Sequence, residues 1–230
     1  MKKLTQYFSK TELILWISSV ILITVSFLLF DRSSYLTLIA SLLGVTSLIY
    51  CAKGNPIGSL LMIIFCILYG IISYSFDYYG EMITYLGMSL PMSVVCFISW
   101  YKNPFKGNHA EVTVSSIKAK DLPLIGIFVV IVTVIFYFIL EYFQTANLIP
   151  STISVATSLL AVCLTAKRSP YFALAYAAND LVLIVLWVLA SFTDITYISV
   201  VICFIVFFVN DLYGFYNWLQ MKKHQQESES

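Results

Sequence analysis

Long uninterrupted apolar runs are the feature of this sequence that most constrains its fold. Eight stretches reach 18 residues or more with little charge, and about 18 residues of helix are enough to cross the roughly 30 Å hydrocarbon core of a bilayer. The runs lack the alternation of a membrane β-barrel, so helices must satisfy the backbone within lipid. The predicted spans are Leu13–Phe30, Tyr35–Ala52, Pro56–Phe76, Met82–Tyr101, Leu122–Phe143, Leu148–Ala166, Tyr171–Phe192 and Tyr197–Leu219.

The composition excludes the soluble classes of protein. Of the 230 residues, 60% are hydrophobic and 11% are charged, whereas soluble domains have about 45–50% apolar and about 25% charged residues. A soluble globule of this size cannot bury that much apolar surface. We therefore exclude a soluble enzyme, a disordered chain and a nucleic-acid-binding protein, and the net charge of +1 gives no general affinity for polyanions.

No sequence motif indicates catalysis, a metal or a cofactor. The five cysteines lie in apolar runs without a C-x-x-C pair, and neither histidine has a metal-ligand spacing around it. We interpret the cysteines as packed or lipid-facing side chains. Nucleophile and nucleotide-binding motifs are absent, and the short connections leave no room for a soluble catalytic domain. We therefore expect a protein that is not an enzyme and has neither metal nor cofactor.

Basic residues predict the orientation of the spans. With eight crossings, 12 of the 13 Lys and Arg residues fall on the side of both termini, and only Arg32 falls on the other. Loops rich in Lys and Arg stay in the cytoplasm, so both termini are predicted to be cytoplasmic. Trp100, Tyr101 and Trp218 would then lie in the aromatic belt at the cytoplasmic interface. The basic residues on that side are Lys2, Lys3, Lys10, Lys53, Lys102, Lys106, Lys118, Lys120, Lys167, Arg168, Lys222 and Lys223.

Two turns on the predicted cytoplasmic side share the pattern Ala-Lys-x-x-Pro. They are Ala52–Pro56 and Ala166–Pro170, 114 residues apart, and Trp100 and Trp218 stand at the ends of the units that contain them. Each turn joins a span rich in small residues to an aromatic-rich span. We interpret spans two to four and six to eight as two parallel three-helix repeats, a plan known among transporters. The alternative is a chance match of a short pattern.

The expected fold is therefore an all-α polytopic membrane protein with eight transmembrane helices arranged 1+3+1+3. Pro91, four residues after Gly87, predicts a kink in the fourth span, which could serve as a hinge or be static. The predicted parts are an extra N-terminal helix (1–34), a first bundle (35–101), a cytoplasmic loop with a linker helix (102–146), a second bundle (147–219) and a polar cytoplasmic tail (220–230).

Strongly polar residues near mid-bilayer are costly and are candidates for function. They are Asn179 and Asp180 in the seventh span and Asn210 and Asp211 in the eighth, at similar depth. The positions in the first repeat that are equivalent to Asn179 and Asp180 are Phe65 and Cys66. This difference between the repeats favours contact with a ligand over a purely architectural role. The alternative is that the amides and carboxyls bond one another and hold the two spans together.

Helical spacing adds aromatic and hydroxyl side chains to these faces. Such a pocket suits a flat heterocycle that bears hydroxyls, and the carboxyls would favour a cationic ring. No Lys, Arg or His lies inside a span as a relay, so we expect transport without ion coupling. The candidate substrate-binding residues are Asn179, Asp180, Trp187, Asn210, Asp211, Tyr213, Tyr69, Ser73 and Tyr176.

Between about Ala52 and Trp218 the sequence resembles the PnuC family of bacterial vitamin transporters. The resemblance implies two parallel three-helix bundles joined by a linking helix, as in the SWEET sugar transporters, in a bacterial inner membrane. It also implies uptake of nicotinamide riboside by facilitated diffusion through alternating access, trapping of the product by intracellular phosphorylation, and a homotrimer. The most specific matches are Lys53–Gly58, Leu68–Tyr74, Tyr78–Glu81, Tyr176–Asp180 and Asn210–Gly214.

The resemblance also implies a type of binding site. Family sites place aromatic side chains around the nicotinamide and Asn or Gln at the ribose, and Asn179, Trp187, Asn210 and Tyr213 are the matching types here. The W-x-x-W pair of some members is absent, so the position of the ring stays open. Related proteins carry thiamine, riboflavin or deoxynucleosides, which are alternative substrates. A membrane enzyme or a sensor without transport activity is the alternative from another class.

Overall fold

The computed structural model describes residues 7–75, 79–145 and 147–228, and this part of the chain is mostly helical. Predictions on Lys2, Lys3, Phe76, Tyr78 and the boundary at residue 146 lie outside it. Within it, seven helical segments are long and apolar enough to cross a membrane. Their helices are α2 (Lys10–Phe30), α3 (Tyr35–Ala52), α4 (Pro56–Ser75), α7 (Asp121–Tyr142), α8 (Leu148–Ala166), α9 (Tyr171–Ser191) and α10 (Ile198–Glu227), the last preceded by the 3₁₀ turn η2 (Ile195–Tyr197).

The fourth predicted span is helical but changes its geometry part-way. It consists of α5 (Tyr79–Ile83), the π-helix η1 (Thr84–Ser89) and α6 (Leu90–Tyr101), which follow one another directly. The π turn contains Gly87 and ends just before Pro91, whose ring cannot fit against the carbonyl four residues earlier in a regular α-helix. The distortion therefore lies where the proline predicts a kink, and π turns of this kind are frequent at functional sites.

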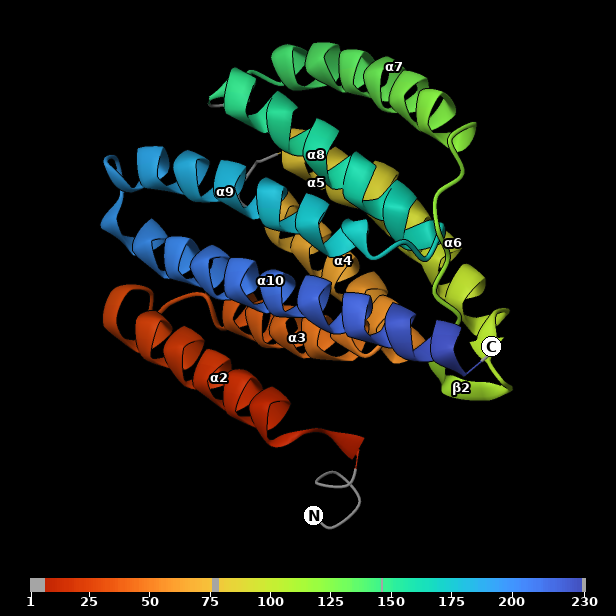
Figure 1. Ribbon diagram of the computed structural model, residues 1–230. Coiled ribbons are helices and arrows are strands. Elements are labelled where there is room, and N and C mark those ends of the chain that lie inside the picture. The colour runs from red at the N-terminus through yellow and green to blue at the C-terminus, as the bar shows by residue number, and fades with distance from the viewer. Residues whose placement is uncertain (1–6, 76–78, 146, 229–230) are drawn as a thin grey trace.

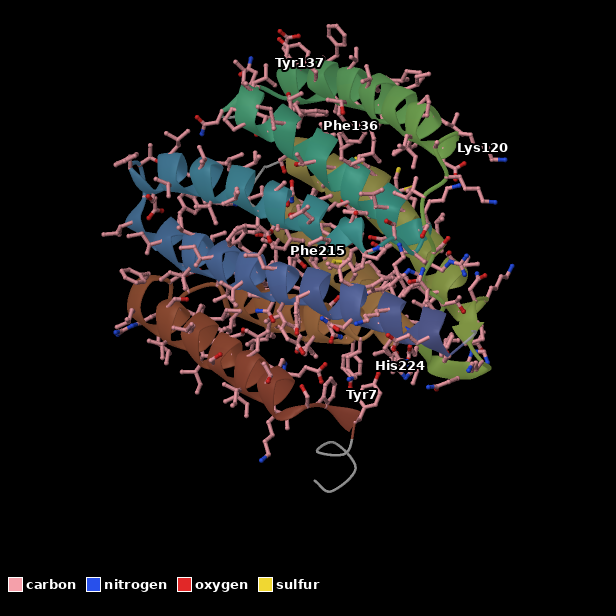
Figure 2. All side chains as sticks on the ribbon, in the orientation of Figure 1. Tyr7, Lys120, Phe136, Tyr137, Phe215 and His224 are labelled. Atoms are coloured by element: carbon pink, nitrogen blue, oxygen red, sulfur yellow. The ribbon has the colours of Figure 1, made fainter. Side chains whose placement is uncertain are left out.

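The helices pack side by side between two outer helices. Figure 1 shows α7 at one edge and α2 at the other, with α8, α9, α10 and α3 between them and α4 to α6 behind. α2 contacts α3 and α10, while α7 contacts mainly α8. Phe136 of α7 is buried against α8 (Figure 2), whereas most of the remaining surface of α7 is exposed and apolar. An exposed apolar helix face is what contact with lipid requires.

The two Ala-Lys-x-x-Pro turns adopt the same backbone conformation. The third residue of each is left-handed, with φ of 64° at Gly54 and 57° at Arg168. This conformation ends the preceding helix. A proline stands two residues later: Pro56 is the first residue of α4 and Pro170 is the N-cap of α9, and the missing N–H of a proline has no cost at the start of a helix. Glycine takes this conformation without strain, whereas an arginine does so only where the surroundings hold it.

Trp100 and Trp218 are fully buried, and their ring centroids lie 5.2 Å apart. The Trp100 Nε1 donates a hydrogen bond of 2.8 Å to the carbonyl of Thr165, and the Trp218 Nε1 donates one of 2.8 Å to the carbonyl of Cys51. The prediction of an aromatic belt is therefore wrong for both tryptophans. Each indole N–H instead donates to a carbonyl in the last turn of a helix, and that carbonyl also accepts the N–H of Gly54 or Arg168 from the turn that follows.

The residue before each tryptophan also donates a side-chain hydrogen bond to a carbonyl at the end of a helix. Ser99 Oγ donates to the carbonyl of Ala166, and Asn217 Nδ2 donates to the carbonyl of Ala52, each over 2.7 Å. The two acceptor carbonyls are 114 residues apart and the two donors are 118 apart, so equivalent positions of the predicted repeats bond each other reciprocally. We call Ser99, Trp100, Asn217 and Trp218 the tryptophan clasp.

The connection between α6 and α7 crosses both turns beneath the clasp. It forms a hairpin of β1 (Pro104–Phe105) and β2 (Asn108–Val112), which pair antiparallel. The Val112 N–H then donates to the carbonyl of Gly54, and the Ser115 N–H donates to that of Arg168, each over 2.9 Å. Gln225 of α10, which is buried, donates from its Nε2 to the Val112 carbonyl. We call residues 112–115 the linker strap, and it ties the two turns together.

Gly58 lets α3 and α4 approach closely. A Cβ there would lie 2.7 Å from the Cys51 backbone nitrogen and 2.9 Å from the Ser47 carbonyl oxygen. Gly58→Ala should therefore lower the free energy of unfolding by about 1–3 kcal/mol, as overpacking does, read out as thermal stability in detergent. Gly126→Ala is the matched control, since a Cβ there meets nothing within 4 Å. An equal loss in both variants would contradict this account.

Candidate functional site

A cavity of about 160 Å³ lies among the helices, lined by residues of α3, α4, α6, α7, α8, α9 and α10 as well as η1. Cys51, Thr165 and Phe172 line it and also contact the clasp, the first two through their carbonyls and Phe172 through its ring, 4.9 Å from that of Trp218. The clasp therefore lies next to the cavity, at the end of the bundle that carries both turns. We call this end the basic end, from Lys53 and Lys167.

Asn179 of α9 is buried and lines the cavity. Two hydroxyls of α8 donate to its Oδ1, from Ser154 over 3.0 Å and from Thr157 over 2.8 Å. Its Nδ2 makes no hydrogen bond within the described part of the chain. The amide is thus held in place through its oxygen and keeps two N–H donors for an occupant of the cavity.

Asp180 and Asp211 line the same cavity from α9 and α10, and both are buried. Their carboxyl groups lie close enough to interact directly. Asp180 Oδ2 receives no hydrogen bond from an N–H group or a hydroxyl of the described residues. Among the described residues, no Lys, Arg or His lines the cavity, and no group of three or more His, Cys, Asp or Glu is placed to hold a metal ion.

Aromatic rings form much of the remaining cavity wall. Tyr176, one helical turn before Asp180, lines it and packs edge-on against Phe172, with centroids 6.2 Å apart. From the other side, Tyr85 of η1 lines the cavity and packs on Tyr69, with centroids 4.6 Å apart. Tyr69 itself does not line the cavity, so it supports the wall from behind.

The sequence profile of the family described as nicotinamide mononucleotide transporter matches residues 34–220. The chain belongs to this family. The nicotinamide riboside transporter PnuC of Neisseria mucosa is 28% identical over 201 residues, which cover 84% of this chain and 75% of that protein. The PnuC of Haemophilus influenzae is 23% identical over 212 residues, covering 91% and 90%. The resemblance to the PnuC family is thereby confirmed.

A crystal structure of a PnuC vitamin B3 transporter has the same fold. It superposes with a TM-score of 0.80 at 24% identity and covers 95% of this chain and 94% of the other. The family match begins at residue 34 and leaves out α2. In this member, α2 is fixed to the basic end by an ion pair of 3.2 Å between Glu12, which is buried, and Lys53.

Four of the predicted binding residues of this family member lie away from the cavity. Asn210 donates to Ser19 of α2 over 2.9 Å and to the Val206 carbonyl over 2.8 Å, so it joins α10 to α2, whereas the alternative predicts that it bonds the polar side chains of the seventh span. Successive helical residues point about 100° apart, so Asn210 faces α2 while its neighbour Asp211 faces the cavity. Trp187 packs on Tyr197, with centroids 5.3 Å apart, in an apolar cluster. Tyr213 is half-buried near Ser9 and Glu12, and Ser73 is buried within α4.

Of the binding residues predicted from the sequence, four line the cavity: Tyr176, Asn179, Asp180 and Asp211. Most of the hydroxyl groups that line it were not predicted. A signal for them existed, because the span Leu148–Ala166 is rich in Ser and Thr, and its hydroxyls hold Asn179. A second signal was the proline after η1, because it predicts a distorted turn. The distorted turn supplies residues to the cavity wall, and a regular helix would orient these residues differently. The missed hydroxyl-bearing residues are Ser59, Thr84, Tyr85, Ser89, Ser93, Ser151, Ser154, Ser158 and Thr165.

Proposed function

We propose that this chain transports nicotinamide riboside across a membrane and that the central cavity is its binding site. The observation that carries the proposal is the cavity of a PnuC-family chain in which the Asn179 amide keeps two free donors beside the Tyr176 ring. A flat nicotinamide ring stacks on aromatic faces, and ribose hydroxyls bond an amide and Ser or Thr. The names of the relatives support the same substrate.

We further propose a 1+3+1+3 arrangement of eight spans, in which α5, η1 and α6 together make the fourth. The supporting observations are the matched left-handed turns and the reciprocal hydrogen bonds of the tryptophan clasp. Two parallel repeats can rock against each other around a central site, which gives alternating access. The clasp and the linker strap join the two units at the basic end, so both must part when the cavity opens there.

The basic end is proposed to face the cytoplasm of a bacterial inner membrane. The charge bias of the sequence supports this orientation, and Tyr7 and His224 lie at the same end of the molecule (Figure 2). Reporter fusions at both termini should therefore be active only in their cytoplasmic form. An active periplasmic reporter at either end would contradict the proposed topology. The homotrimer, and trapping of the product by a separate kinase, are proposed on the family resemblance alone.

Exchange in liposomes tests the transport function. Proteoliposomes loaded with unlabelled nicotinamide riboside should take up the labelled compound, and ionophores that collapse proton or sodium gradients should leave the rate unchanged. Accumulation of unmodified substrate driven by either ion gradient would contradict facilitated diffusion. Uptake of thiamine, riboflavin or a deoxynucleoside in place of nicotinamide riboside would contradict the proposed substrate.

A further inference from the structure

The buried carboxyl pair of Asp180 and Asp211 has no role in the amide and hydroxyl contacts proposed for the ribose. Both side chains line the cavity, and Asp180 Oδ2 receives no hydrogen bond from an N–H or hydroxyl of the described residues. Buried acidic groups are costly unless a cation or several donors compensate them. Within the described part of the chain no basic side chain lines this cavity, and each carboxyl group interacts with the other, so no fixed positive charge of these residues compensates the pair.

The first three-helix unit shows that these positions do not need carboxyl groups for packing. The repeat offset of 114 places Cys66 opposite Asp180, and the offset of 118 that relates the two tryptophans places Ser93 opposite Asp211. Cys66 Sγ and Ser93 Oγ are also neighbours, 4.0 Å apart, and both line the cavity. One unit thus has a neutral pair where the other has an acidic pair, in the same place in the fold.

A cationic occupant explains the acidic pair. The ring nitrogen of a pyridinium nucleoside carries a fixed positive charge, and a carboxylate beside it provides the countercharge that the protein lacks. Tyr176 lies one turn from Asp180 on the cavity wall, so an aromatic face and a carboxyl group are available to the same ring. A phosphate group, in contrast, would meet acidic side chains and none of the Lys, Arg or His residues that the structure describes.

We propose that Asp180 and Asp211 form a charge filter that selects the cationic pyridinium ring of the substrate. The filter favours the cationic ring over the neutral 1,4-dihydro form of the same nucleoside, and the same carboxyl groups repel the phosphate of the mononucleotide. This inference rests on the proposed function, because it concerns the ligand of the same cavity. It adds that charge, and not only ring shape and hydroxyls, decides which nicotinamide compound binds.

The test compares two ligands that differ in charge but share the carboxamide and the ribose. Affinities of the purified protein for nicotinamide riboside and for its dihydro form are measured by calorimetry, with the mononucleotide as a third ligand. The wild type should bind the cation about tenfold or more tightly than either of the others. In D180N/D211N the preference for the cation over the dihydro form should fall to near unity, while binding of the dihydro form persists.

Two variants control for folding and for general charge effects. D180C/D211S copies the neutral pair of the first unit, so it keeps a combination that this fold already packs, and it should lose the same preference. D194N removes a fully exposed carboxyl outside the spans and should leave the preference unchanged. Equal binding of both nucleoside forms by the wild type, or an unchanged preference in D180N/D211N, would overturn the charge filter alone. Failure of the wild type to bind either form would overturn the proposed function and the filter with it.

Discussion

Trp218→Ala should lower the free energy of unfolding by about 3–5 kcal/mol, the range for truncating a large buried aromatic side chain. Trp218 is fully buried, its ring contacts those of Trp100 and Phe172, and its Nε1 satisfies the Cys51 carbonyl. Truncation leaves a cavity and removes one of the hydrogen bonds to the Cys51 carbonyl, which keeps its bond from the Gly54 N–H. Thermal unfolding in detergent measures the loss, and Trp100→Ala should show a loss of similar size because its contacts are reciprocal.

Two further variants separate packing from hydrogen bonding in the clasp. Trp218→Phe keeps a ring but removes the indole donor, so its loss should be about 1–3 kcal/mol. Tyr101→Ala is the matched control, because this neighbour of Trp100 is 55% exposed and should cost little. A loss at Tyr101 as large as that at Trp218, or stability unchanged in Trp218→Ala, would contradict a clasp that joins the units.

Asn179→Ala should weaken binding of nicotinamide riboside by roughly 5- to 150-fold, which corresponds to about 1–3 kcal/mol for a lost hydrogen bond to a buried ligand group. Its Oδ1 is occupied by Ser154 and Thr157, and its Nδ2 remains free at the cavity. Calorimetric titration of the purified variant gives the affinity. A modest loss of stability should accompany the effect, because the two hydroxyls of α8 lose their acceptor.

Asn210→Ala is the matched control for this binding experiment, since it removes the same amide from the neighbouring helix. Asn210 bonds Ser19 of α2 and does not line the cavity. Its truncation should therefore lower thermal stability while the folded protein keeps its affinity, and Trp187→Ala should behave in the same way. Loss of affinity in Asn210→Ala with wild-type binding in Asn179→Ala would place the substrate between α2 and α10 instead.

Local sequence signals predicted the helices well because their causes are local. The thickness of the hydrocarbon core sets the length of an apolar run, and the turn at Gly54 and Pro56 ends one helix and starts the next through its own backbone preferences. Seven predicted spans have matching helices, and the fourth departs from regular helix where Pro91 predicts it. The repeat pattern also foretold which turns would have matching conformations.

Local sequence signals did not predict which side of each helix faces the protein interior and which side faces lipid. In a soluble protein the apolar stripe of a helix marks its buried side, but here lipid and protein interior are both apolar, so the pattern contains little of that information. Trp100 and Trp218 therefore looked like interfacial residues, although α8 provides the Trp100 N–H with a carbonyl and α3 provides one for the Trp218 N–H. Only the packing of these helices against one another decided that.

The sequence by itself determined that this chain crosses a membrane, where most of its helices begin and end, and that the polar residues at mid-bilayer are candidates for function. It did not predict that α10 continues through the polar tail to Glu227. Tertiary structure alone decided which of them meet. Asn210 and Asp211 are adjacent in the chain, yet one bonds α2 and the other lines the cavity. The physical reason is that a helix turns about 100° per residue, so the role of each polar side chain depends on which neighbouring helix packs on its face.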